Sequence, residues 1–172
     1  MRDYRNAPER LSDMKRFIFV GFQKSCYNMA KFDSDPERRM AVILEQDPSV
    51  QLWMKPGPNQ FKIYDEDNAP YQPDFVIETK TDKLIIETKR ASEMTNPLVL
   101  RKADAAALWC QIANRWNEGG AGDKPWSYLL VPETAVLPNT TVGGLRAAHT
   151  LSVEAGLMSR YSSHEEDLDR TS

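Results

Sequence analysis

Two acidic residues and a lysine have types and a spacing that could form a catalytic site. Asp74 directly follows Pro73, twelve residues separate it from Glu87, and Lys89 lies two positions beyond Glu87. Side chains alternate between the faces of an extended segment, so Glu87 and Lys89 would share one face. Mg²⁺ takes one or two protein carboxylates together with phosphate oxygens and water, and a lysine adds a positive charge beside them. These residues therefore point to a Mg²⁺ site that hydrolyses phosphodiesters.

The surrounding sequence predicts an antiparallel hairpin that would bring these residues together. Two β-rich runs flank a polar turn. A two-residue turn centred on residues 81–82 would place Asp74 opposite Lys89 and Val76 opposite Glu87. An odd number of turn residues would move Asp74 to the other face unless a bulge corrected it.

A second Glu-x-Lys sequence, residues 78–80, lies in the first run of the hairpin. Asp65 precedes Glu78 by the same gap that separates Asp74 from Glu87. No proline precedes Asp65, its surroundings have the composition of a loop, and Glu78 lies near the turn, so we favour the later motif. The alternative is that the acidic hairpin is only a solvated face, as in an ordinary interaction domain.

The rest of the chain predicts a mixed α/β domain. Ser34 and Glu37 have capping-box spacing, Pro36 suits a first helical turn, and Asp47-Pro48 ends that helix. A long helix is expected to follow Asn96-Pro97. Its core-facing stripe is expected to comprise Ala105, Trp109, Ile112 and Trp116. Further strands are expected over residues 16–22, 50–56, 60–66 and 126–132, and a marginal helix over 145–160.

Length and composition favour one domain of the ordinary globular kind. The chain has 172 residues, 41% hydrophobic and 27% charged. We expect a loose lead-in over residues 1–14, one domain over 15–158 and a disordered acidic tail over 159–172. The apolar runs are too short for a bilayer, no secretory signal opens the chain, and two cysteines form no zinc motif. A cytoplasmic protein without a membrane span is the expectation.

The net charge of −3 sets a condition on any nucleic-acid function. Residues 160–172 hold four acidic and two basic residues, so the remainder is close to neutral. Nucleic-acid binders are usually basic, because phosphate neutralisation supplies much of their affinity. Either this chain does not bind nucleic acid, or another component contributes to binding.

The motif and its flanking segments resemble the PD-(D/E)XK nuclease superfamily. The order of six segments is similar to that in the C-terminal endonuclease region of type III restriction subunits: KFDSDPERRMAVILE, Trp53–Pro56, YQPDFVIET, LIIETKR, RKADAAALWCQIAN and KPWSYLLVP. The similarity spans about residues 16–132. It implies an α/β restriction-endonuclease-like fold, with a central mixed sheet flanked by helices in an αβββαβ core.

The resemblance also implies roles for individual residues. Asp74 and Glu87 would hold Mg²⁺, for which Mn²⁺ could substitute, and Lys89 would position or polarise the attacking water. Glu37 fits the acidic residue that superfamily members often carry on the first core helix. The alternative is that Glu37 only closes the capping box, and Glu45 is a weaker candidate for the same role.

The expected function is a metal-dependent endodeoxyribonuclease domain acting on double-stranded DNA within a restriction system. Upstream ATP-dependent motor motifs of type III subunits have no counterpart in this chain, and target recognition would lie in a separate modification (methyltransferase) subunit. Arg90, Arg101 and Lys102 could contact phosphates, although solvated charges are the alternative. Two further alternatives are a catalytically silent domain that docks DNA or a partner, and a nuclease of the DNA-repair type.

Overall fold

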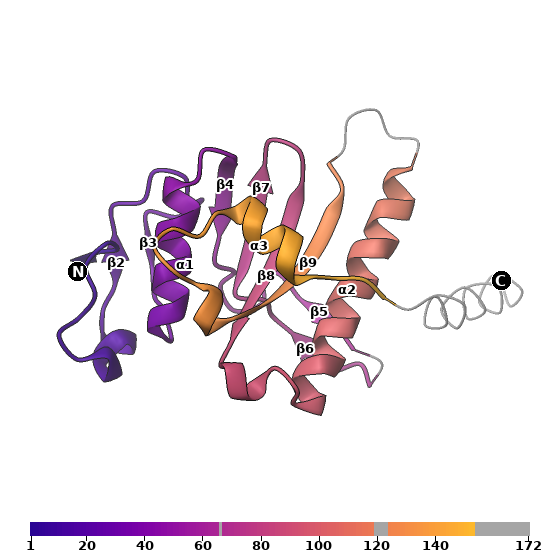
Figure 1. The fold of residues 1–172 in the computed structure, drawn as a ribbon, viewed down its shortest axis with the longest axis horizontal. Helices are drawn as coiled ribbons and strands as arrows, with labels where there is room; N and C mark the ends of the chain where they lie inside the picture. The colour runs from indigo at the N-terminus through magenta and orange to yellow at the C-terminus, as the bar shows by residue number, and fades with distance from the viewer. Residues whose placement is uncertain (66, 119–123, 154–172) are drawn as a thin grey trace, which may run out of the picture.

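A five-stranded mixed sheet forms the centre of the computed structural model, which describes residues 1–65, 67–118 and 124–153 (Figure 1). The strand order is β10-β9-β8-β7-β4. β8 and β9 run parallel, and the remaining pairings are antiparallel. The strands are β4 (Val50–Met54), β7 (Phe75–Thr79), β8 (Lys83–Lys89), β9 (Trp126–Pro132) and β10 (Thr150–Leu151).

Helices cover both faces of this sheet. α1 (Asp35–Gln46) and α3 (Val142–His149) pack on one face, where their apolar side chains join those of β7, β8 and β9 in one core. α2 (Pro97–Asn117) covers the other face over β8 and β9 and makes the crossover between these parallel strands. The sequence α1, β4, β7, β8, α2, β9 confirms the expected αβββαβ core (Figure 1).

Two small sheets and three short 3₁₀ helices complete the described elements. β1 (Arg2–Asp3), β2 (Phe19–Val20) and β3 (Met29–Ala30) form one sheet. β5 (Ile63–Tyr64) and β6 (Pro70–Tyr71) form the other, so the run at 60–66 pairs outside the main sheet. The 3₁₀ helices are Leu11–Arg16, Ala91–Glu93 and Glu133–Ala135.

The predicted start of α1 is confirmed. The Ser34 hydroxyl accepts a hydrogen bond from the Glu37 amide, and Pro36 lies in the first turn. The Glu37 carboxylate in turn accepts from the Asp33 amide, so two amides at the helix start are satisfied by side chains. The helix ends at Gln46 with Asp47 as its extended C-cap, as expected for the residue before a proline.

The predicted core stripe of α2 is wrong by a rotation about the helix axis. The residues of α2 that are buried are Ala103, Ala106, Ala107 and Cys110. Small side chains at these positions let the helix approach the sheet closely. Trp116 is 79% exposed, whereas Trp109 packs edge-on against Trp126 with ring centroids 5.1 Å apart. Large apolar residues on this helix therefore mark the border of the packed face and not its centre.

The first fourteen residues are packed on the domain and do not form the loose lead-in that their composition suggested. β1 pairs in parallel with β2, and the side chains of Tyr4 and Met14 are buried. The buried Arg38 guanidinium donates to the backbone carbonyl of Tyr4 at 3.0 Å, which ties this segment to α1. The first fourteen residues, although mostly polar, thus contribute the buried side chains of Tyr4 and Met14 to the main core.

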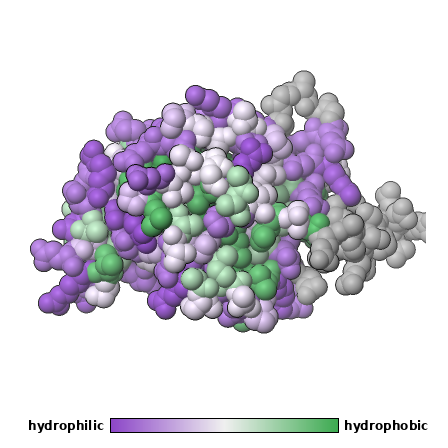
Figure 2. Space-filling model, viewed as in Figure 1, coloured by the Kyte–Doolittle hydropathy of each residue, from purple (hydrophilic) through white to green (hydrophobic). Residues whose placement is uncertain are grey.

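The C-terminal part differs from its expectation in one respect. The expected marginal helix is shorter and earlier, as α3, and the chain then enters β10. The expected acidic tail lies outside the described residues. No helix within the described ranges combines the length and apolar character needed to cross a membrane. On the face shown in Figure 2, hydrophobic residues gather near α3 and hydrophilic ones dominate the N-terminal edge.

Candidate active site

The hairpin of β7 and β8 brings Asp74 and Glu87 side by side. Phe75 pairs with Ile86, so the residue before β7 lies against Glu87. The Asp74 amide donates to Glu87 Oε2 at 3.2 Å. The hairpin is therefore confirmed, and both carboxylates lie at its open end.

The predicted register is wrong by two residues. Glu78 pairs with Lys83, and the Thr79 amide donates to the Asp82 carbonyl, so the turn is centred on residues 80–81 and not on 81–82. Asp74 consequently faces Glu87 instead of Lys89. A shift by an even number keeps every side chain on its expected face, so the predicted cluster survives the error.

Glu87 is the most deeply buried member of the cluster. Its Oε2 accepts hydrogen bonds from the Tyr71 hydroxyl at 2.8 Å and the Asp74 amide at 3.2 Å. Its Oε1 pairs with Lys89 Nζ at 2.5 Å. Burial, followed by repulsion from the Asp74 carboxylate, raises the pKa of Glu87 to about 7. A cation placed here would therefore relieve an unfavourable concentration of negative charge.

Asp74 is held by the residue between Glu87 and Lys89. Its Oδ2 accepts from both the amide and the hydroxyl of Thr88, each at 2.8 Å. Its other oxygen, Oδ1, accepts no hydrogen bond from the residues that the structure describes. One carboxylate oxygen is thus fixed by the protein while the second is available to a ligand.

Glu37 from α1 joins the same cluster through electrostatics. Burial raises the pKa of Glu37, the ammonium group of Lys55 lowers it, and the Asp74 carboxylate raises it further. Glu37 Oε2 also pairs with Lys55 Nζ at 2.8 Å. The capping-box contacts described above are present as well, so Glu37 both caps α1 and contributes charge next to Asp74.

Lys55, which follows β4, is a member that sequence reasoning missed. Its side chain is largely buried and pairs with Glu37. Burial alone would lower the pKa of Lys55, but the carboxylates of Glu37 and Asp74 together raise it. A buried lysine after a short strand carries no motif of its own, although it lies in a segment similar to the nuclease family.

Tyr71 is the second missed member, and it supports Glu87 from behind. Its hydroxyl donates to Glu87 and lies 3.4 Å from the Tyr128 hydroxyl, all within the buried layer beneath α2. Tyr71 precedes the Pro-Asp pair by two residues, on the opposite side of the motif from the glutamate. Its contribution depends on β6 folding back on the main sheet, which the local pattern does not indicate.

The weaker candidates have structural partners elsewhere. Glu45 accepts hydrogen bonds from the amides of Gln23 and Lys24 and from the Trp53 indole, so its carboxylate ties the N-terminal segment to β4. Asp65 accepts from amides within the β5–β6 turn, as expected for a loop residue. Neither residue contacts the cluster through these bonds.

The basic residues near the site differ in their availability. Arg101 pairs with Asp65 and Asp67 and so fastens α2 to the β5–β6 turn. Lys102 is exposed, with its ammonium group 6.0 Å from the centre of the Tyr71 ring. Of these two, Lys102 is the one whose charge remains available to a phosphate.

The donor set of the cluster suits a hard cation. Asp74 and Glu87 offer carboxylate oxygens, which Mg²⁺ prefers, and Asp74 Oδ1 is available for one such bond. Among the residues that the structure describes, no group of three or more acidic, histidine or cysteine side chains is arranged around a common metal position. Two carboxylates completed by water and phosphate oxygens fit Mg²⁺, which rarely relies on an all-protein cage.

Comparison with known families agrees with this geometry. A sequence model described as an endonuclease domain matches residues 23–113, which is more than half of the chain. The chain belongs to this endonuclease domain family. The matched region includes α1, the hairpin and most of α2, and therefore every residue of the cluster. No curated protein matches the chain significantly.

Family membership and architecture together fix the class of the domain. The mixed sheet with helices on both faces is a restriction-endonuclease-like fold, and the family identifies a nuclease domain. The prediction of the nuclease class from sequence is therefore confirmed.

Proposed function

We propose that this domain is a Mg²⁺-dependent endodeoxyribonuclease that hydrolyses phosphodiester bonds in double-stranded DNA. The observation that carries the proposal is the convergence of Asp74, Glu87 and Lys89 at the open end of one hairpin, inside a region that matches an endonuclease family. Two carboxylates and a lysine held together by burial are costly without a bound cation. A cation bound for phosphodiester hydrolysis would offset this cost.

Asp74 and Glu87 would hold the metal in this proposal. Bound Mg²⁺, or Mn²⁺ in its place, supplies charge neutralisation at the phosphate and lowers the pKa of a bound water. Thr88 fixes one oxygen of Asp74, and Tyr71 fixes one oxygen of Glu87, so both carboxylates are oriented before any ligand arrives. This preorganisation reduces the reorganisation that binding would require.

Lys89 and the Glu37–Lys55 pair contribute charge around the same point. Lys89 can exchange its contact with Glu87 for one with the attacking water or a phosphate oxygen, because its side chain is partly exposed. Glu37 places a third carboxylate near Asp74, and Lys55 neutralises it. The chain's residues thus set the position of the water and offset the charge that develops on the phosphate.

The wider assignment is a cleavage module of a type III-like restriction-modification system in the cytoplasm. It rests on the order of the flanking segments noted above. The near-neutral charge of residues 1–159 also supports delivery to DNA by other components. A modification (methyltransferase) subunit would read the target, and an ATP-dependent motor region, for which residues 1–172 carry no motif, would supply movement on DNA.

The direct experiment is cleavage of supercoiled plasmid by purified protein with Mg²⁺ or Mn²⁺. Wild type is expected to nick or linearise the plasmid, Asp74→Ala to be inactive, and the exposed-site variant Glu9→Ala to match wild type. Wild-type activity no higher than that of Asp74→Ala would contradict the proposal. Activity confined to branched or single-stranded DNA would instead favour a repair-type nuclease.

A further inference from the structure

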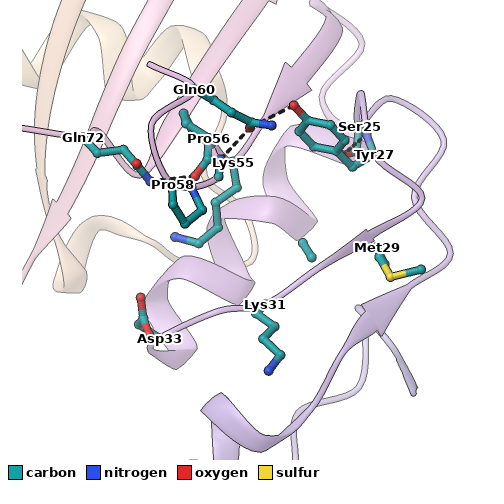
Figure 3. A pocket seen from close by; sticks show the side chains of 12 residues that line it. Ser25, Tyr27, Met29, Lys31, Asp33, Lys55, Pro56, Pro58, Gln60 and Gln72 are labelled. Carbon is teal, nitrogen blue, oxygen red and sulfur yellow. Dashed lines mark hydrogen bonds between the residues drawn. The ribbon is translucent and has the colours of Figure 1, made fainter. Parts of the chain in front are cut away.

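A cavity of about 470 Å³ opens beside the candidate active site (Figure 3). It lies between the segment that contains β3 and the loop that follows β4. Lys55 and Asp33 line the cavity and also contact the cluster, because Lys55 Nζ and the Asp33 amide both bond to Glu37 Oε2. A molecule in the cavity would therefore lie next to the carboxylates.

One wall of the cavity carries a fixed aromatic ring. The Tyr27 hydroxyl donates to Gln60 Oε1 at 2.9 Å, and the Gly57 amide donates to the same oxygen at 2.7 Å (Figure 3). Gln72 Nε2 donates to the Pro56 carbonyl, which fastens the neighbouring side of the loop. Tyr27 is 39% exposed, so its ring is held in place while part of its surface remains open to a ligand.

The charges at the cavity suit an anionic ligand. Lys31 lines the cavity, is exposed, and forms no ion pair with the residues that the structure describes. Asp33 is the acidic residue of the lining, and Lys15 Nζ lies 3.4 Å from its Oδ1. Lys31 therefore remains as an available positive charge at a distance from the cluster's own lysines.

We propose that this cavity binds the nucleotide that adjoins the scissile phosphate on the strand being cut. Tyr27 would pack against its base or sugar, and Lys31 would bind the next phosphate along the strand. A ring offers affinity for any base, because every base has an apolar face, and a lysine contacts phosphate without reading sequence. The cavity would thus position DNA without selecting its sequence. This inference rests on the proposed function, because it takes the cluster as the point of cleavage.

The test measures DNA affinity and cleavage separately. A short fluorescent duplex is titrated in EDTA, where cleavage is absent, and the dissociation constant is followed over a range of salt concentrations. The variants are Tyr27→Ala and Lys31→Ala. The matched controls are Trp116→Ala, an exposed aromatic residue near the end of α2, and Lys80→Ala, an exposed lysine in the hairpin turn. Cleavage of saturating duplex with Mg²⁺ is then measured for each protein.

Tyr27→Ala is expected to raise the dissociation constant roughly tenfold, whereas Tyr27→Phe, which keeps the ring, stays within about threefold of wild type. Lys31→Ala is expected to lower the slope of log affinity against log salt by about one, as loss of one phosphate contact requires. A merely structural role would not change that slope. The controls Trp116→Ala and Lys80→Ala should match wild type in both affinity and cleavage, because neither residue lines the cavity.

The outcomes separate this inference from the proposed function. If wild type binds and cuts while both cavity variants keep wild-type affinity and salt slope, the cavity proposal is overturned and the nuclease assignment stands. If the cavity variants lose affinity as expected but wild type does not cut with Mg²⁺ or Mn²⁺, the nuclease assignment fails while DNA binding at the cavity is supported. If wild type cuts plasmid with Mg²⁺ or Mn²⁺ but does not bind the duplex, the cavity proposal is overturned and the nuclease assignment stands. If wild type neither binds nor cuts, both are overturned.

Discussion

The same tripeptide, Glu-Thr-Lys, occurs at both ends of one hairpin, with different surroundings. At residues 87–89 the glutamate side chain is 7% exposed and contacts Asp74, Tyr71 and Lys89. At residues 78–80 the glutamate side chain is 40% exposed and pairs with Lys124 at 2.7 Å. The tripeptide alone therefore does not identify a site. Burial and contacts with residues distant in the sequence make only one copy part of a charged cluster.

The two threonines show the same difference. The Thr88 hydroxyl donates to Asp74 and so orients a carboxylate of the cluster. The Thr79 hydroxyl accepts from the amides of Thr81 and Asp82 and so stabilises the turn. Identical local sequence therefore supports a site at the open end of the hairpin and a turn at the closed end.

The largest expected difference is between variants in which one of the two glutamates is replaced by glutamine. Glu87→Gln is expected to lower the rate of DNA cleavage by more than about a hundredfold, because it removes a charge that would bind the metal. Glu78→Gln is expected to stay within about twofold of wild type. The measurement is single-turnover cleavage of plasmid DNA with Mg²⁺. Equal losses in both variants would remove the distinction between the two motifs.

The lysines of the two motifs form the next comparison. Lys89→Met keeps the apolar stem but removes the charge beside Glu87, and a loss of roughly a hundredfold in cleavage rate is expected. Lys80→Met removes an exposed charge in the turn and should have no measurable effect. The single-turnover cleavage assay measures both rates. A Lys89→Met enzyme as active as wild type would exclude a role for this lysine in the reaction.

The Glu37–Lys55 pair extends the cluster beyond the hairpin. Lys55→Met leaves Glu37 buried near Asp74 without its partner, and we expect cleavage to fall about tenfold. Glu37→Gln keeps the shape and tests the carboxylate charge alone. Its effect should be of similar size. If both variants cut DNA at the wild-type rate, Glu37 acts only as the helix cap.

The smallest effect concerns stability and its dependence on pH. Because the folded pKa of Glu87 is about 7 and the unfolded value is near 4.5, the folded protein binds the extra proton between these values. This contribution to stability is fully present below about pH 4.5 and is lost as pH rises through 7. Without metal, Glu87→Gln should therefore exceed wild type in stability above pH 7, by on the order of 2–3 kcal/mol.

Urea unfolding in EDTA at pH 5 and pH 8 measures this difference, with Glu78→Gln as the control. The advantage of Glu87→Gln over wild type should be larger at pH 8 than at pH 5. An advantage that is independent of pH, or that is larger at pH 5, would show that Glu87 is not protonated preferentially in the folded state.

Local sequence was sufficient for several elements of the fold. The cap of α1 follows from Ser34 and Glu37, the start of α2 from Asn96 and Pro97, and the hairpin from its two β-rich runs. These features depend on residues close together in the chain. The family order of segments added the αβββαβ arrangement, which periodicity alone does not determine.

Features that depend on contacts between distant parts of the chain could not be predicted from local sequence. Asp82, beside the hairpin turn, pairs through its carboxylate with Arg146 of α3 at 2.7 Å, 64 residues further along, and local sequence does not indicate this contact. The rotation of α2 depends on how closely its alanines can approach the sheet. The parts played by Lys55 and Tyr71 likewise arise from elements that meet only in the folded chain.

The candidate site illustrates how a prediction with the wrong register can still bring the same residues together. Asp74, Glu87 and Lys89 were predicted to converge through a register that the structure does not adopt. The two-residue shift preserved the faces, so the same three residues meet at one end. Their proposed catalytic roles stay predictions until they are tested.

The central claim is that Asp74 and Glu87 together bind a divalent metal, and calorimetric titration with Mg²⁺ and Mn²⁺ tests it most directly. Wild type and Glu78→Gln are expected to bind with the same affinity, and Glu87→Gln at least tenfold more weakly. The titration is repeated with a short DNA duplex, whose phosphate can complete the set of ligands. Equal binding by wild type and Glu87→Gln, or no binding by wild type even with duplex present, would contradict the account.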